Sequence, residues 1–84
     1  MIITNETVWV NRMIAMIARV NRLRVIPVWA LVDDRIFTLT LACGARSATT
    51  NLGIGDVRSA LGGNESSQAT IARTITELFG RVAA

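Results

Sequence analysis

The chain has 84 residues, of which 51% are hydrophobic, and its formal net charge at neutral pH is +3. This length predicts one domain and excludes a second hydrophobic core. With one cysteine, Cys43, and no histidine, the chain excludes an internal disulfide and a cysteine-cluster metal site, and it lacks the commonest catalytic base. It also has no lysine, which excludes a Walker A loop. We therefore expect no metal and no cofactor.

The apolar content is high for so short a chain, with a mean hydropathy of +0.43. A domain of this size buries only about 60–65% of the surface that its unfolded chain exposes. The longest clean apolar run, residues 25–32, is far shorter than the roughly 20 residues of a membrane-spanning helix. The first residues lack the basic segment of a signal peptide. We expect a cytoplasmic protein that covers its surplus apolar surface by forming a homo-oligomer or by binding another protein.

Residues 6–24 predict an amphipathic helix, with Thr4 or Asn5 as its N-cap and Glu6 near the positive end of its dipole. At about 100° per residue, one half of the helical wheel is apolar and the other carries most of the polar side chains. The apolar half comprises Trp9, Val10, Met13, Ile14, Met16, Ile17, Val20 and Leu23. An arc this broad can cover a sheet and a neighbouring subunit together.

Residues 24–32 and 35–43 predict two antiparallel strands joined by a turn at Asp33 and Asp34. The first strand is apolar on both faces, which is typical of a strand covered on both sides. Pro27 cannot donate to a ladder, so it predicts an edge position or a bulge. In the second strand, side chains alternate between a fully apolar face and a mixed one. The apolar face comprises Phe37, Leu39, Leu41 and Cys43. Residues 45–50 predict either a short third strand or a loop.

Two helices are predicted in the last third of the chain. Asp56 is the expected N-cap of a short helix over 56–61, which the pair Gly62 and Gly63 ends. A longer helix over 66–82 has an apolar stripe on one side, while Glu77 and Arg81 are spaced for an ion pair on the other. The stripe comprises Ile71, Ala72, Ile75, Leu78, Phe79 and Val82. The sequence thus predicts an α+β fold in the order α-β-β-α-α, with a small antiparallel sheet of two or three strands packed by the N- and C-terminal helices.

The residue types that usually carry catalysis are sparse and have structural explanations. Cys43 falls on the inward face of its strand, with no histidine to activate it as a nucleophile. Gly53 and Gly55 can present backbone N–H groups to a phosphate, but turn glycines before a capped helix are the better interpretation. The acids outside the two long helices are typical of solvated turns and caps; they are Asp33, Asp34, Asp56 and Glu65. We therefore expect a protein that is not an enzyme.

The arginine-bearing side of the first helix is the best candidate for binding an anion. Each guanidinium group can neutralise one phosphate of a nucleic acid. The candidate nucleic-acid-binding residues are Arg12, Arg19, Arg22 and Arg24. An ordinary solvated helix face explains the same pattern, and a helix lying on a membrane surface is a third interpretation. Large apolar side chains are the candidate anchors of a subunit interface; they are Trp9, Met13, Met16, Trp29 and Phe79.

The second strand and the segment after it also carry a family resemblance. The matching residues are Phe37, Leu39, Leu41, Ala42, Gly44 and Arg46, followed by Asn51, Leu52, Asp56, Val57 and Leu61. In these positions the chain resembles the small α-subdomain that precedes the ATPase core of FtsK/SpoIIIE-type DNA translocases. It departs from that pattern at the turn, where the family favours Gly-Pro, and after Gly63, where the family returns to strand. The resemblance implies a role beside a DNA-handling machine.

Together these observations predict a small, non-enzymatic, self-associating binding module that docks on nucleic acid or on a DNA-handling complex through its arginines. The alternative is a protein-only interaction module, such as a small inhibitor or adaptor from a mobile element, which uses exposed apolar surface. The dependence of binding on salt distinguishes the two.

Overall fold

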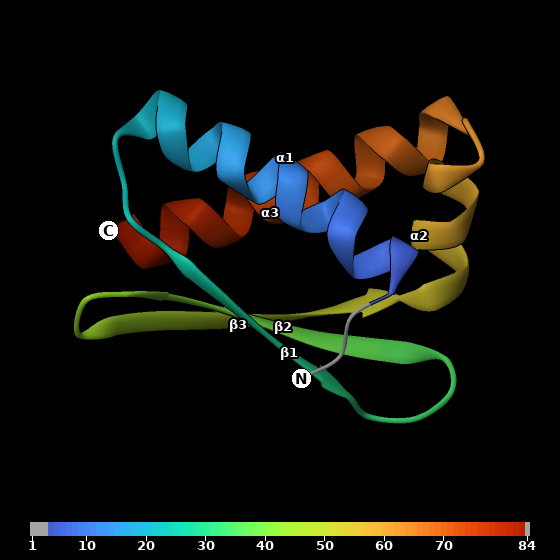
Figure 1. Ribbon diagram of the computed structural model, residues 1–84, viewed down its shortest axis with the longest axis horizontal. Helices are drawn as coiled ribbons and strands as arrows, with labels where there is room; N and C mark the ends of the chain where they lie inside the picture. The colour runs from blue at the N-terminus through green and yellow to red at the C-terminus, as the bar shows by residue number, and fades with distance from the viewer. Residues whose placement is uncertain (1–3, 84) are drawn as a thin grey trace.

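The computed structural model describes residues 4–83. Its elements, in chain order, are α1 (Asn5–Asn21), β1 (Ile26–Leu31), β2 (Ile36–Cys43), β3 (Arg46–Gly53), α2 (Ile54–Leu61) and α3 (Glu65–Ala83). The strands form one antiparallel sheet in the order β1-β2-β3, and the helices lie on one of its faces (Figure 1). The predicted α+β fold is confirmed, and the segment 45–50, left open between strand and loop, belongs mostly to a third strand.

The sheet is a meander with β2 at its centre. Leu39 of β2 lies opposite Trp29 of β1 and Thr50 of β3. The Val32 N–H donates to the Ile36 carbonyl at 3.1 Å, so the N–H groups at the even positions of β1 also point toward β2. The missing N–H of Pro27 therefore falls on the outer edge, where no ladder bond is lost. The predicted edge position of Pro27 is confirmed.

Both ends of α1 are closed by local hydrogen bonds. Of the two candidate caps, Thr4 is the N-cap, and its hydroxyl accepts from the Thr7 N–H at 3.2 Å while the Thr7 hydroxyl accepts from the Thr4 N–H at 3.0 Å. At the other end, Arg22 is left-handed with φ 55°, and the Leu23 N–H donates to the Ala18 carbonyl at 2.9 Å. This is a Schellman motif with arginine at the position where glycine is usual.

The junction between β3 and α2 differs from the prediction. The N-cap of α2 is Gly53, and Asp56 lies inside the first turn without capping it. The reason is that β3 runs directly into the helix, and the Ile54 N–H is already bonded to the Arg35 carbonyl at 2.8 Å. Because Gly55 lies within α2, these glycines do not form a phosphate-binding loop. The start of α3 is capped by Asn64, whose Oδ1 accepts from the Ser67 N–H at 2.9 Å.

The core lies between the sheet and the three helices. Alternation along β2 places Phe37, Leu39 and Leu41 in this core, as predicted, and Cys43 is half-buried against it. Trp29 of β1 packs edge-on against Phe37, with ring centroids 5.5 Å apart. The other elements contribute mostly aliphatic side chains: Val10, Ile14, Val57, Ile71, Ile75, Leu78 and Val82.

Two burial predictions are wrong. Met16 and Val20, assigned to the covered half of α1, are 67% and 83% exposed, whereas Thr7 and Ala18 are buried. The buried arc of α1 centres on Val10 and Ile14, and small side chains beside them let the helix approach the other elements closely. The first strand, predicted to be covered on both sides, is covered on one, because all helices lie on the same face of the sheet (Figure 1).

Candidate nucleic-acid interface

Arg12 and Arg19 lie on the solvent side of α1, and both are exposed. They are seven residues apart, which corresponds to about 10 Å along the helix axis and to nearly the same direction around it. Their orientation follows from the packing of α1, because Val10 and Ile14 point into the core on the opposite side. The two guanidinium groups therefore project from one face of one rigid element.

Arg22 and Arg24 continue this surface around the C-terminal end of α1. Arg22 occupies the left-handed position that ends the helix, and Arg24 lies in the short connection to β1. Both side chains are exposed. The carbonyl groups at a helix C-terminus favour nearby cations, so Arg19 and Arg22 also stabilise the end of α1. We call the four residues Arg12, Arg19, Arg22 and Arg24 the arginine surface.

Among residues 4–83, no carboxylate forms an ion pair with the arginine surface. Within residues 4–83 the single ion pair joins Arg58 Nε to Glu6 Oε1 at 2.8 Å, at the other end of α1. The Arg58 hydrogen bond, followed by hydrogen bonds within the first turn of α1, lowers the pKa of Glu6. That pair links α1 to α2, whereas the arginine surface faces solvent.

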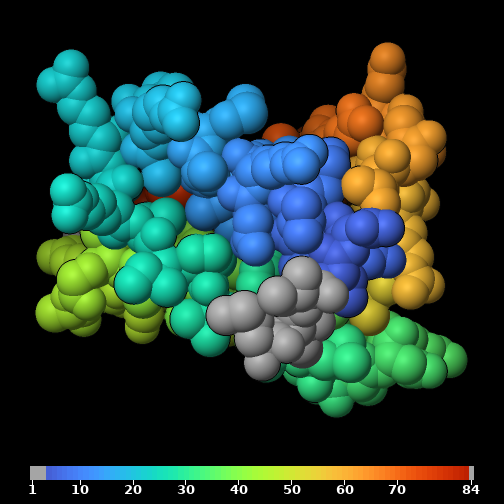
Figure 2. All heavy atoms as spheres, in the orientation of Figure 1, coloured from blue at the N-terminus to red at the C-terminus, as the bar shows by residue number. Residues whose placement is uncertain are grey.

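The fold also separates charge along the molecule. The basic end, where α1 and α3 terminate and β2 turns into β3, carries Arg19, Arg22, Arg24, Arg46 and Arg81. The acidic end, where α1 and α3 begin and β1 turns into β2, carries Glu6, Asp33, Asp34, Asp56 and Glu65. Arg35 and Arg58 lie at the acidic end as well. Figure 2 shows these two ends on opposite sides of α1.

The contribution of Arg46 and Arg81 to the basic end was not predicted from the sequence. Arg46 begins β3 and Arg81 lies in the last turn of α3, so only the tertiary fold brings them to the end of α1. The predicted ion pair of Arg81 with Glu77 does not form. Instead, Arg81 Nη1 donates to the Thr49 carbonyl at 3.2 Å. That carbonyl lies on the outer edge of β3, where no strand of the described chain supplies a donor.

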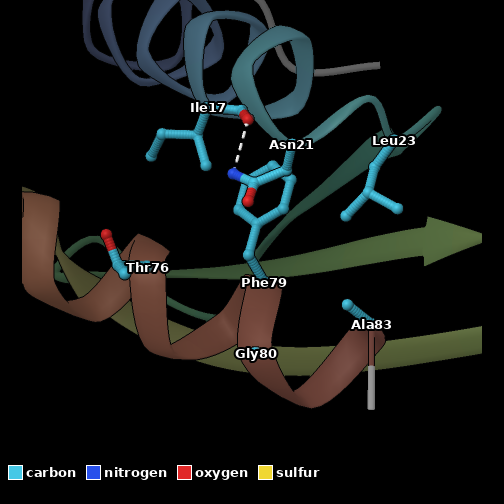
Figure 3. Close-up of a pocket in the computed structure, with 7 residues that line it drawn as sticks. All are labelled: Ile17, Asn21, Leu23, Thr76, Phe79, Gly80 and Ala83. Carbon is cyan, nitrogen blue, oxygen red and sulfur yellow. Dashed lines mark hydrogen bonds between the residues drawn. The ribbon is translucent and has the colours of Figure 1, made fainter.

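A shallow apolar groove of about 250 Å³ lies at the basic end between α1 and α3 (Figure 3). Its lining residues are Ile17, Asn21, Leu23, Thr76, Phe79, Gly80 and Ala83. The Asn21 Nδ2 in this groove donates to the Ile17 carbonyl at 2.8 Å. The groove is therefore mainly apolar, and it lies at the same end of the molecule as Arg19, Arg22 and Arg81.

The five predicted interface residues differ in how far they are exposed to solvent. Met16 is exposed, whereas Trp9, Met13 and Trp29 are half-buried against the core. Phe79 is only 4% exposed and belongs to the core of its own chain. Trp29 Nε1 donates to Asn11 Oδ1 at 2.8 Å, a contact that sequence periodicity did not reveal. Among these five, Met16 is the side chain most available to a partner.

In the part of the chain that the structure describes, no three His, Cys, Asp or Glu side chains gather in a group that could hold a metal ion. None of its helices is both long and apolar enough to cross a membrane. The chain matches no protein-family model, no curated protein and no solved structure. The resemblance to the translocase subdomain therefore stays a prediction.

Proposed function

We propose that this protein is a small, non-enzymatic, self-associating binding module that docks on nucleic acid, alone or within a DNA-handling complex, through the arginine surface. Two observations support this proposal most: within the described residues these arginines have no carboxylate partner, and five of the six acids lie at the other end of the molecule. Such separation produces a positive field on one side despite a net charge of only +3.

The spacing of the arginines suits a phosphate backbone. Arg12 and Arg19 project in the same direction, and Arg22 and Arg24 extend the row around the helix end. Guanidinium groups bind phosphate oxygens with two parallel hydrogen bonds. No alternation of aromatic and basic side chains accompanies them, so contacts to the backbone are favoured over stacking on bases.

The proposal is tested by fluorescence anisotropy of a labelled DNA duplex over a series of salt concentrations. If all four arginines contact phosphates, the logarithm of the association constant should fall against the logarithm of the salt concentration with a slope of about −3 to −4. The double charge reversal Arg12→Glu and Arg19→Glu should remove most of the affinity and flatten this slope.

Arg35→Glu is the matched control, because Arg35 is exposed but lies in the turn at the acidic end. It changes the net charge by the same amount per residue as each reversal on α1. Binding that weakens equally in Arg35→Glu and in Arg12→Glu would show a response to net charge alone. That result would contradict a localised arginine surface.

A protein-only interaction module is the second candidate, and the exposed apolar side chains favour it. Met16 and Val20 lie outward on α1, and the groove beside Phe79 lies at the same end of the molecule. Burial of such side chains is only weakly sensitive to salt. A partner protein whose binding persists at high salt but is lost in Met16→Ser and Val20→Ser would support this candidate over nucleic acid.

A further inference from the structure

The face of the sheet that points away from the helices has no charged side chain. We call it the open face; it consists of the even-numbered residues of β1 and β2 and the odd-numbered residues of β3. Figure 1 shows no helix over it. The nine arginines and six acids of the chain therefore all lie elsewhere. Depletion of charge is typical of the centre of a protein–protein interface.

The open face is apolar along β1 and hydroxyl-bearing across β2 and β3. Ile26 and Val28 of β1 are 67% and 53% exposed. On the neighbouring strands, the hydroxyls of Thr40 and Thr49 bond to each other at 2.8 Å, and the Thr38 hydroxyl donates to Asn51 Oδ1 at 3.2 Å. These cross-strand bonds already occupy polar groups, which lowers the cost of removing the face from water.

The charged residues at the two ends of the sheet favour a second copy of this chain as the partner of the open face, in one particular orientation. Arg24 precedes β1 and Arg46 begins β3, whereas the turn after β1 at the opposite end carries two acids, Asp33 and Asp34, against one arginine, Arg35. If two copies pack face to face with their strands parallel, the two-fold axis runs along the strands, β1 lies on β3 of the other copy, and Arg24 meets Arg46. If the strands run antiparallel, the apolar β1 strands lie on one another, and Arg24 of each copy meets Asp33 and Asp34 of the other.

We propose that the open face binds a second copy of this chain, in a two-fold dimer whose sheets pack face to face with their β1 strands antiparallel. The two-fold axis lies in the interface, perpendicular to the strands, so that the same surface serves both copies. The dimer has four layers, with the helices of both copies on the outside. This inference rests on the self-association part of the proposed function. It shares one residue, Arg24, with the arginine surface, so the nucleic-acid part is tested at Arg12 and Arg19 instead.

Thr40→Arg tests the surface, because Thr40 lies on the central strand of the open face. A charge there has no partner in the dimer, and we expect the dissociation constant to rise at least about a hundredfold. Ala69→Arg is the matched control, since Ala69 is exposed on α3, away from the sheet. The dimer is followed by sedimentation velocity over a concentration series, and circular dichroism verifies that each variant is folded.

A charge exchange tests the orientation without changing the centre of the face. Arg24→Asp and Asp34→Arg should each weaken the dimer about tenfold, because each places like charges together at both ends. The double variant restores opposite charges and should recover most of the affinity. Both residues are exposed, so folding is retained even if Thr40→Arg does not fold.

The possible results separate this inference from the nucleic-acid proposal. A wild-type dimer that Thr40→Arg dissociates and that the double exchange restores supports the inference. A dimer that withstands Thr40→Arg and both single exchanges overturns it while leaving self-association intact. A wild-type monomer at every concentration overturns both this inference and self-association, whereas binding of a duplex is measured separately with Arg12→Glu and Arg19→Glu.

Discussion

At the level of single residues, the backbone and the side chain of Arg22 favour different amino acids. Its backbone occupies the left-handed region, with φ 55°, to complete the Schellman motif that ends α1. This region disfavours side chains with a Cβ and is usually occupied by glycine. The exposed side chain, however, belongs to the arginine surface. The presence of arginine where glycine would be more stable supports a binding function for the Arg22 side chain.

Replacement of Arg22 separates stability from binding. In Arg22→Gly, relief of the left-handed conformation should exceed the loss of the charge at the helix end and raise the free energy of unfolding by about 0.5 kcal/mol, while loss of a guanidinium weakens binding to the duplex. Arg19→Gly is the control, because glycine inside a helix lowers stability by about 1 kcal/mol. Urea denaturation and anisotropy measure the two effects. A destabilised Arg22→Gly, or one with unchanged duplex affinity, would contradict this assignment.

The Glu6–Arg58 pair predicts a pH dependence of stability. Arg58, helped by the first-turn hydrogen bonds, lowers the pKa of Glu6 in the folded state relative to the unfolded chain. The contribution of Glu6 is therefore present above the ordinary glutamate pKa and is lost as the pH falls through the lowered value. Because the Arg58 side chain is 68% exposed, this contribution should be about 0.5 kcal/mol or less.

The measurement compares the free energy of unfolding of wild type and Glu6→Gln between neutral and acidic pH. The variant should be slightly less stable at neutral pH, and the difference should vanish in acid. Glu77→Gln is a suitable control, since Glu77 forms no ion pair within residues 4–83. A difference between Glu6→Gln and wild type that persists at the lowest pH would show that the ion pair is not its source.

At the level of elements, the helix ends decide how α2 and α3 are joined. Gly63 has φ 100°, and the Asn64 N–H donates to the Ser59 carbonyl at 3.0 Å, which gives α2 the same kind of ending as α1. Asn64 then caps α3, and Gln68 Nε2 donates to the Ala60 carbonyl at 2.9 Å, fixing the angle between the two helices. This short connection needs a glycine at one position.

Two glycine-to-alanine changes should therefore have opposite effects. Gly63→Ala forces a Cβ into the left-handed region and should lower the free energy of unfolding by about 1 kcal/mol or more. Gly80 lies within α3, and a Cβ added there has no atom within 4 Å. Gly80→Ala should instead stabilise the protein by about 0.5–1 kcal/mol. Thermal unfolding of both variants measures the contrast, and destabilisation of the same size in both would refute it.

At the level of the whole molecule, the two proposals together predict a bridging activity. In the face-to-face dimer the helices lie outside, so the arginine surfaces of the two copies point in opposite directions. One dimer can then hold two duplexes. Fluorescence energy transfer between duplexes with different labels should rise on addition of wild-type protein.

Thr40→Arg should bind a single duplex but give no transfer between duplexes, while Ala69→Arg should behave like wild type. Both variants add the same positive charge, so a difference between them cannot come from electrostatic attraction alone. Equal transfer with both variants would show that bridging does not depend on the open face.

Local patterns in the sequence determined most elements of this protein, but they left β3 open between strand and loop and began α2 two residues late. The alternation of Phe37, Leu39 and Leu41 defined a half-buried strand, and the stripe from Ile71 to Val82 defined α3, because both depend on residues within a few positions of one another. The missing N–H of Pro27 likewise indicated an edge position or a bulge, and the structure has the edge position. The arginines of α1 were identified as exposed for the same reason.

The tertiary structure decided which of two apolar faces is covered. By periodicity alone, Met16 and Val20 on α1 and Ile26 and Val28 on β1 were expected to be buried; the placement of every helix on one face of the sheet left them exposed. It also brought Arg46 and Arg81 to the end of α1 and moved the acids to the opposite end. Burial and charge separation depend on contacts between residues distant in the chain, which local periodicity does not encode.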